Sequence, residues 1–118
     1  MLLVQDDRTH EKLVLKKINL DKCSRKEKQL AEQEAVIMTK LKALRHPHII
    51  DLKCFQHVTR PPQPGHKSER HYLFLLVEYA SNGDLTKLIQ KFRIQKKKLR
   101  NPGEDKILRI FKQIALGL

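Results

Sequence analysis

The 118-residue sequence contains little of what marks a secreted or a membrane protein. It has only two cysteines, Cys23 and Cys54, which is too few for the disulfide framework of a small secreted domain. No apolar run approaches the roughly 20 residues that span a bilayer, and the first residues lack the basic segment of a signal peptide. We therefore expect no membrane partner and a cytoplasmic location, with the nucleus or the cytoskeleton as further possibilities.

Glycine is also scarce, and it is never clustered. The four glycines, Gly65, Gly83, Gly103 and Gly117, are far apart, so these residues contain no Gly-x-Gly-x-x-Gly loop of the kind that cradles phosphates. The six histidines and two cysteines include no pair with the spacing and partners of a closed zinc site. A structural metal site is therefore not expected.

Positive charge, in contrast, is abundant. The 25 lysines and arginines exceed the 13 acidic residues and give a formal net charge of +12. Such a balance is typical of proteins that meet nucleic acid, anionic membranes or acidic substrates. The cations are scattered, however, and no zinc-ligand array, aromatic RNA-binding motif or basic leucine heptad accompanies them. Solvated helix faces explain the charge better, and nucleic-acid binding is the less favoured alternative.

The apolar residues follow two different periods along the chain. Alternating or β-branched runs predict strands at residues 2–4, 13–18, 49–55 and 72–79, with a polar loop at 59–70. Ser24 and Glu27 form a capping-box pattern that starts a long helix, which we expect to continue to Leu44, before His46-Pro47. Further helices are predicted at 85–94 and 104–118, joined by a solvated connection at 96–103. The order predicts an α+β fold, an antiparallel sheet with one long helix against it.

Two charged residues stand among apolar neighbours in these elements. Lys16 lies in the second strand between aliphatic residues, and Glu34 lies in a helical stripe of apolar side chains. If paired, they would offset much of each other's desolvation and hold an ammonium ready for phosphate. Periodicity alone is equally compatible with Lys16 in solvent and Glu34 at the helix edge. The stripe is expected to consist of Leu30, Glu34, Ile37, Met38, Leu41 and Leu44.

Four segments in order resemble the protein kinase family. Residues 13–16, Leu-Val-Leu-Lys, are similar to its Val-Ala-Ile-Lys strand, and residues 45–50 to the His-Pro-Asn-Ile-Val after its first long helix. Residues 73–85 resemble its fifth strand, hinge and next helix start, and residues 107–118 the helix before its catalytic loop. The spacing from Lys16 to Glu34 and the segments 83–85 and 113–118 resemble the NIMA-related group of serine/threonine kinases.

The resemblance implies both a fold and a reaction. Residues 1–79 would form the strands and first helix of a kinase N-lobe, residues 80–84 the end of the hinge, and residues 85–118 the first helices of an incomplete C-lobe. The activity would be transfer of the γ-phosphoryl group of ATP, with Mg²⁺, to serine and threonine hydroxyls of protein substrates.

The resemblance also implies residue roles. Lys16 would hold the α- and β-phosphates, with Glu34 as its partner in a supporting ion pair. Met38 and Leu52 match the two N-lobe positions of the hydrophobic regulatory stack. The remaining expected nucleotide contacts are Val14 over adenine, Val77 as gatekeeper, the backbone of Glu78 and Ala80 against adenine, and Asp84 near the ribose.

The sequence departs from the family in several places. Three extra residues precede His46-Pro47, so the helix end or the following turn should be longer than usual. Neither His-Arg-Asp nor Asp-Phe-Gly occurs, so the catalytic base and the metal ligands are outside these residues. We expect a fragment that is inactive alone; a truncated pseudokinase-like interaction module is the alternative. Arg60 to Pro64 could be a polyproline II ligand for an SH3-like domain, although a plain surface loop is the favoured interpretation.

Overall fold

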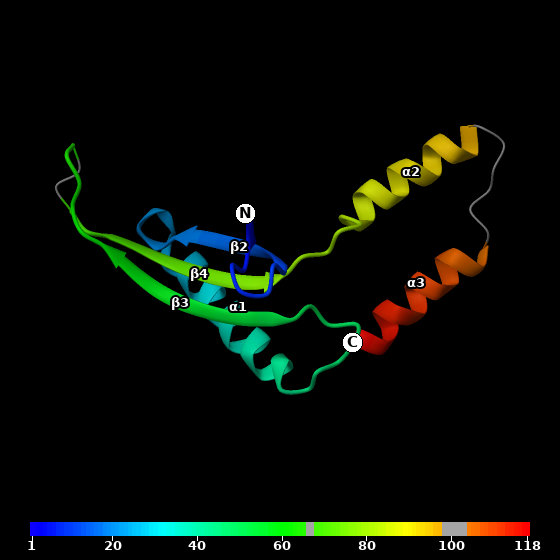
Figure 1. Ribbon diagram of the computed structural model, residues 1–118, viewed down its shortest axis with the longest axis horizontal. Coiled ribbons are helices and arrows are strands. Elements are labelled where there is room, and N and C mark those ends of the chain that lie inside the picture. The colour runs from blue at the N-terminus through cyan, green and yellow to red at the C-terminus, as the bar shows by residue number, and fades with distance from the viewer. Residues whose placement is uncertain (66–67, 98–103) are drawn as a thin grey trace. The chain divides into compact units, whose positions relative to one another are not determined.

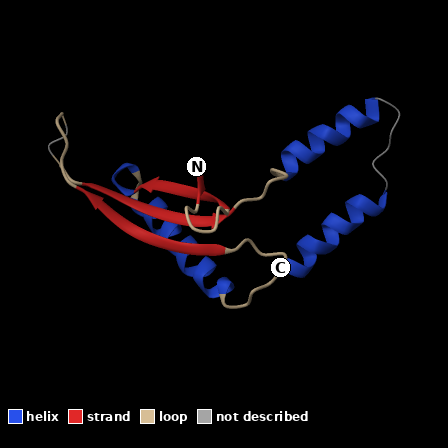
Figure 2. Ribbon diagram, viewed as in Figure 1, coloured by secondary structure: helices blue, strands red, loops and turns tan. Residues whose placement is uncertain are grey.

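The computed structural model describes residues 1–65, 68–97 and 104–118 (Figures 1 and 2). The chain divides into two compact units, Met1–Tyr79 and Ala80–Leu118, and each is described by itself.

The first unit is a four-stranded antiparallel sheet with one long helix. Its strands are β1 (Leu2–Gln5), β2 (Lys12–Asn19), β3 (Leu52–Arg60) and β4 (Arg70–Glu78), in the spatial order β1-β2-β4-β3. A short 3₁₀ turn, η1 (Leu20–Lys22), leads from β2 into helix α1 (Arg25–Lys42). This architecture confirms the predicted α+β fold and the antiparallel sheet with a helix against it.

Helix α1 begins with the predicted capping box. The Ser24 hydroxyl accepts from the Glu27 N–H at 3.3 Å, and the Glu27 carboxylate accepts from the Ser24 N–H at 2.7 Å. That backbone hydrogen bond, aided by the Ser24 hydroxyl, lowers the pKa of Glu27 below its usual value. The helix ends at Lys42, two residues before the predicted end, because residues 43–45 turn back with the N–H of Leu44 bound to Leu41 O and Arg45 in a positive-φ conformation of 47°.

The helix packs through a different stripe from the predicted one. Leu30, Ile37 and Leu44 are 54%, 55% and 67% exposed, whereas Ala31 and Ala35 are buried. The buried alanines are displaced by one residue, about 100° around the helix axis, from the expected stripe. Hydrophobic size misled the prediction, since the helix approaches the sheet where its side chains are smallest. Met38 packs against the same core, as expected.

The core lies between α1 and one face of the sheet. Leu52, Leu73 and Leu75 are almost completely buried and contact Ala31 and Ala35. Strand β3 begins later and runs further than predicted. Ile49 is β-branched but belongs to a turn, with its N–H donated to His46 O. The polar residues up to Arg60 still pair with β4, because one face of an antiparallel sheet can remain open to water.

The described residues of the second unit form two helices, α2 (Leu85–Lys97) and α3 (Glu104–Gly117). Helix α2 runs three residues past its predicted end at Ile94, so Lys96 and Lys97 are helical rather than part of a connection. The rest of the predicted connection, residues 98–103, lies outside the described residues. Among the described residues, no helix is long and apolar enough to cross a membrane.

Candidate nucleotide site

The sheet and the helix bring Lys16 and Glu34 together. Lys16 is in the middle of β2, and Glu34 is in the middle of α1, 18 residues further along the chain. The Lys16 ammonium donates to both carboxylate oxygens of Glu34 at 2.8 Å. Such two-oxygen contact fixes the ammonium better than a single hydrogen bond would.

Neither member of this pair is deeply buried. The Lys16 and Glu34 side chains are 37% and 41% exposed, so Glu34 is paired with Lys16 and also lies at the edge of the helix rather than inside a buried apolar stripe. The reason is the rotation of α1: its alanines enter the core, and Glu34 lies at the edge of that contact. A pair this accessible contributes no more than about 1 kcal/mol to folding. Its accessibility leaves the ammonium open to a second anion.

Strand register aligns Lys16 with two of the predicted nucleotide-site residues, Val14 and the gatekeeper Val77. Val14 of β2 is directly opposite Val77 of β4, and Lys16 is directly opposite Leu75. Residues directly opposed across an antiparallel pair project to the same face, as do residues two apart in one strand. Leu75 and Val77 pack with α1 in the core. Val14, Val77 and Lys16 therefore share the face of the sheet that α1 covers.

Met38 and Leu52, the predicted stack positions, are also brought into one cluster. Leu52 is 2% exposed and opposite Val77 in the sheet, and Met38 packs against the same buried group from α1. Leu52 therefore lies on the face of the sheet that α1 covers, and Met38 packs against that face from the helix. Their regulatory role stays a prediction.

The predicted hinge residues fall on both sides of the boundary between the two units. Glu78 ends β4, and its N–H donates to Asp51 O at 3.0 Å, so this N–H is not available to a nucleotide. Ala80 and Asp84 belong to the second unit. Asp84 accepts from the Lys87 N–H at 2.9 Å and so caps α2, while Ala80 O accepts from the Gly83 N–H. The capping contact gives Asp84 a structural role that does not require a ribose.

A hollow of about 420 Å³ lies beside Glu78 but away from the pair. It is lined by the end of α1, by residues 45–47 and 49–51 and by Glu78. Of the predicted nucleotide contacts, Glu78 lines this hollow, whereas Val14, Lys16 and Val77 lie outside it.

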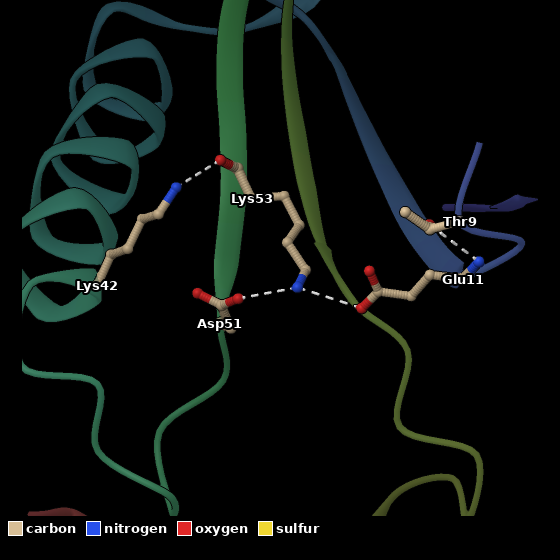
Figure 3. Close-up of polar contacts among 5 residues, drawn as sticks. All are labelled: Thr9, Glu11, Lys42, Asp51 and Lys53. Carbon is tan, nitrogen blue, oxygen red and sulfur yellow. Dashed lines mark hydrogen bonds and ion pairs between the residues drawn. The ribbon is translucent and has the colours of Figure 1, made fainter. Parts of the chain in front are cut away.

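Sequence reasoning missed an ionic cluster at the end of β4 (Figure 3). Lys53 in β3 reaches Asp51 and Glu11, each at 3.1 Å, and Glu11 lies just before β2. The hydrogen bonds with Asp51 and then Glu11 raise the pKa of Lys53 above its usual value. Lys42 of α1 donates to the Lys53 carbonyl at 2.7 Å. This cluster, the Lys53 clasp, connects α1, β3 and the start of β2; no local sequence signal links residues 11 and 53.

The fold and the residues that meet in it define a known class. The family model described as "Protein kinase domain" matches residues 1–118, and the chain belongs to this family.

Its relatives include serine/threonine kinases of the Nek group and a kinase of Schizosaccharomyces pombe. They include serine/threonine-protein kinase Nek5 of Homo sapiens, 34% identical over 89% of this chain and 12% of the relative. Serine/threonine-protein kinase Nek3 of Mus musculus is 33% identical over 99% of this chain and 19% of the relative. G2-specific protein kinase fin1 of Schizosaccharomyces pombe is 32% identical over 90% and 13%, so the chain spans less than a fifth of each of these three proteins. The predicted resemblance to NIMA-related kinases is confirmed.

Mg²⁺, which the family implies, has no evident ligands in the described part of the chain. There, no three His, Cys, Asp or Glu side chains lie where they could hold a metal ion together. The described residues fit ATP better than they fit Mg²⁺. The accessible ammonium of Lys16 and the apolar side chains of Val14 and Val77 lie on one face of the sheet.

Proposed function

We propose that this chain supplies the ATP-binding N-lobe part of a serine/threonine protein kinase, which acts on protein hydroxyls. The single observation that carries the proposal is the position of the Lys16 ammonium. It is held at 2.8 Å from both oxygens of Glu34, on the face that also carries Val14 and Val77. The relatives' names, serine/threonine-protein kinases, support the substrate class.

The pair suits phosphate binding on physical grounds. An ammonium is a compact charge with three donors, and Glu34 uses two of its directions. The remaining donor and the exposed side of Lys16 are open to phosphate oxygens. Val14 and Val77 offer an apolar surface on the same face for an adenine ring. ATP would supply the transferable phosphoryl group; these residues would bind and orient it.

We further propose that the 118 residues alone do not transfer phosphate. Phosphoryl transfer depends on a positioned base and on metal ions that neutralise charge. The sequence holds neither a His-Arg-Asp nor an Asp-Phe-Gly segment. ATP binding and catalysis should therefore be separable in this chain.

The test is displacement of a fluorescent adenine nucleotide by ATP, with and without Mg²⁺. Lys16→Met should weaken ATP binding about fivefold or more, because a charge-assisted contact to phosphate is lost. Lys17→Met is the matched control: Lys17 points to the opposite face of β2, over the Tyr72 ring at 4.4 Å. Equal effects of the two variants would contradict the assignment of Lys16. Absence of ATP binding in the unaltered chain would favour the interaction-module alternative.

A transfer assay with radiolabelled ATP and a general protein substrate tests the second part. We expect no labelled product from the 118-residue chain. Labelling that Lys16→Met abolishes would refute the proposed inactivity while supporting the kinase assignment.

A further inference from the structure

The connection between β3 and β4 carries a proline segment that nothing in the proposed kinase function uses. It reads Arg60-Pro61-Pro62-Gln63-Pro64 and is exposed throughout. Backbone pairing of the hairpin ends at Arg60 opposite Arg70. Proline has no N–H to continue such a ladder, which explains why pairing stops where Pro61 begins.

The segment stands clear of the rest of the sheet. Strand β2 pairs with β4 only as far as Asn19 opposite Tyr72, whereas β3 continues along β4 to Arg70. The hairpin therefore extends past the end of β2, and residues 61–65 follow at its free end (Figure 1). A partner could reach this segment without disturbing the core or the Lys16–Glu34 pair.

The covalent structure of the segment limits its conformation. Pro61, Pro62 and Pro64 have φ fixed near −65°, about the value of a polyproline II helix. Arg60 and Gln63 each precede a proline, which disfavours the α-helical region for them. All five residues are thus biased toward extended or polyproline II geometry before any partner binds. Binding such a preformed segment has a low entropic cost.

Two of its side chains already contact the hairpin. The Arg60 guanidinium lies over the Tyr72 ring, 5.9 Å from its centroid, and the Gln63 amide oxygen accepts from Arg70 at 2.8 Å. In polyproline II geometry, which has about three residues per turn, residues 60 and 63 would lie along one edge. Pro61 and Pro64 would lie along another edge. Because Arg60 and Gln63 make the contacts with the hairpin, the edge with Pro61 and Pro64 remains accessible to a partner.

We propose that Pro61 and Pro64 form a docking ridge for an SH3-type domain. Such domains bind Pro-x-x-Pro ridges in grooves lined by aromatic side chains. The surrounding charge adds a preference: in the described residues 60–65 and 68–70, Arg60 and Arg70 stand against Glu69, a net charge of +1. The fitting partner is an SH3 domain whose groove has an acidic rim. The proposal does not depend on nucleotide binding.

Binding of the 118-residue chain to an array of purified SH3, WW and EVH1 domains tests the proposal. We expect at least one SH3 domain with an acidic groove to bind, and the double variant Pro61→Ala/Pro64→Ala to weaken that binding about tenfold. Raising the salt concentration should weaken it as well, through screening of the basic flanks.

The matched control lies within the same segment. Gln63→Ala removes the contact with Arg70 but keeps both prolines, so binding should stay within about twofold of the unaltered chain. Because the substituted residues are exposed, thermal melting of all variants should coincide, which excludes unfolding as the cause. The proposal is overturned if no SH3 domain binds more tightly than about 1 mM, if only WW or EVH1 domains bind, or if the double variant binds as well as the unaltered chain.

Discussion

The two units of this chain differ in what holds them together. In Met1–Tyr79, an apolar core excludes water from Leu52, Leu73 and Leu75. In the described part of Ala80–Leu118, the large apolar residues of the helices are mostly exposed, including Ile107, Leu108 and Phe111. Both units have well-formed secondary structure. The comparison teaches that a helical pattern alone does not make a core; here the sheet and the alanines of α1 do.

The strongest test of this contrast removes the same atoms from each unit. Leu73→Ala should destabilise the first unit by about 2–5 kcal/mol, because Leu73 is 0% exposed and its loss leaves a cavity. Leu108→Ala in α3, where the residue is 60% exposed, should change the same transition by less than about 0.5 kcal/mol. Urea unfolding followed by circular dichroism measures both. Similar losses would show that the second unit has a core of its own.

Larger side chains introduced into each unit test the same difference between a packed core and exposed helices. Ala35→Leu should cost about 1–3 kcal/mol, since Ala35 is 0% exposed between α1 and the sheet. Ala115→Leu, at an exposed position of α3, should be nearly neutral. Thermal melting of the two variants compares them directly. An unchanged melting temperature for Ala35→Leu would mean that α1 does not pack as closely as described.

The helix caps give a smaller and more local comparison. Ser24→Ala removes the capping box of α1 and should destabilise the first unit by about 1 kcal/mol. Asp84→Ala removes the equivalent side-chain contact at the start of α2. It should lower helicity without moving the first unit's unfolding transition. Chemical denaturation combined with helical circular dichroism separates the two results, and a shared shift would indicate that the units unfold together.

The Lys53 clasp should have the smallest effect, and that effect should depend on pH. Lys53 is a partly exposed group whose pKa is raised by Asp51 and Glu11, so Lys53→Met should cost less than about 1 kcal/mol. A lysine whose pKa is higher in the folded state than in the unfolded state stabilises the fold. That stabilisation is complete below the unfolded-state pKa of about 10.4 and is lost as the pH rises through the folded-state pKa. The difference between Lys53→Met and the unaltered chain should therefore shrink as the pH rises through the raised folded-state pKa of Lys53, and it should vanish once the lysine is neutral in both states. A difference that persisted there would point to packing of the lysine stem.

Local signals predicted the elements well and their faces less well. Ser24 with Glu27 located the start of α1, and the aliphatic run around Val77 located β4. The prediction of the buried face of α1 was wrong because a hydrophobicity pattern favours large residues. The residues that α1 buries against the sheet are the small Ala31 and Ala35.

Of the two long-range ionic contacts, the sequence pattern predicted one and gave no indication of the other. Lys16 and Glu34 were paired in advance because each looked costly alone and because the kinase resemblance linked them. The Lys53 clasp depends on the register shift between Leu52 and Cys54 in β3, at the position of Lys53. Nothing near Glu11 in the sequence indicates that shift.

Because of the alanines of α1, the distances between Lys16 and Glu34 depend closely on the position of this helix. Ala31 and Ala35 have no side-chain rotamers, so at these two contacts with the sheet a small shift of the helix is not absorbed by a change of rotamer. A displacement of α1 by an ångström or so would pass directly to Glu34 and lengthen both 2.8 Å contacts. A binding partner that displaces this helix would thus change how the ammonium of Lys16 is held.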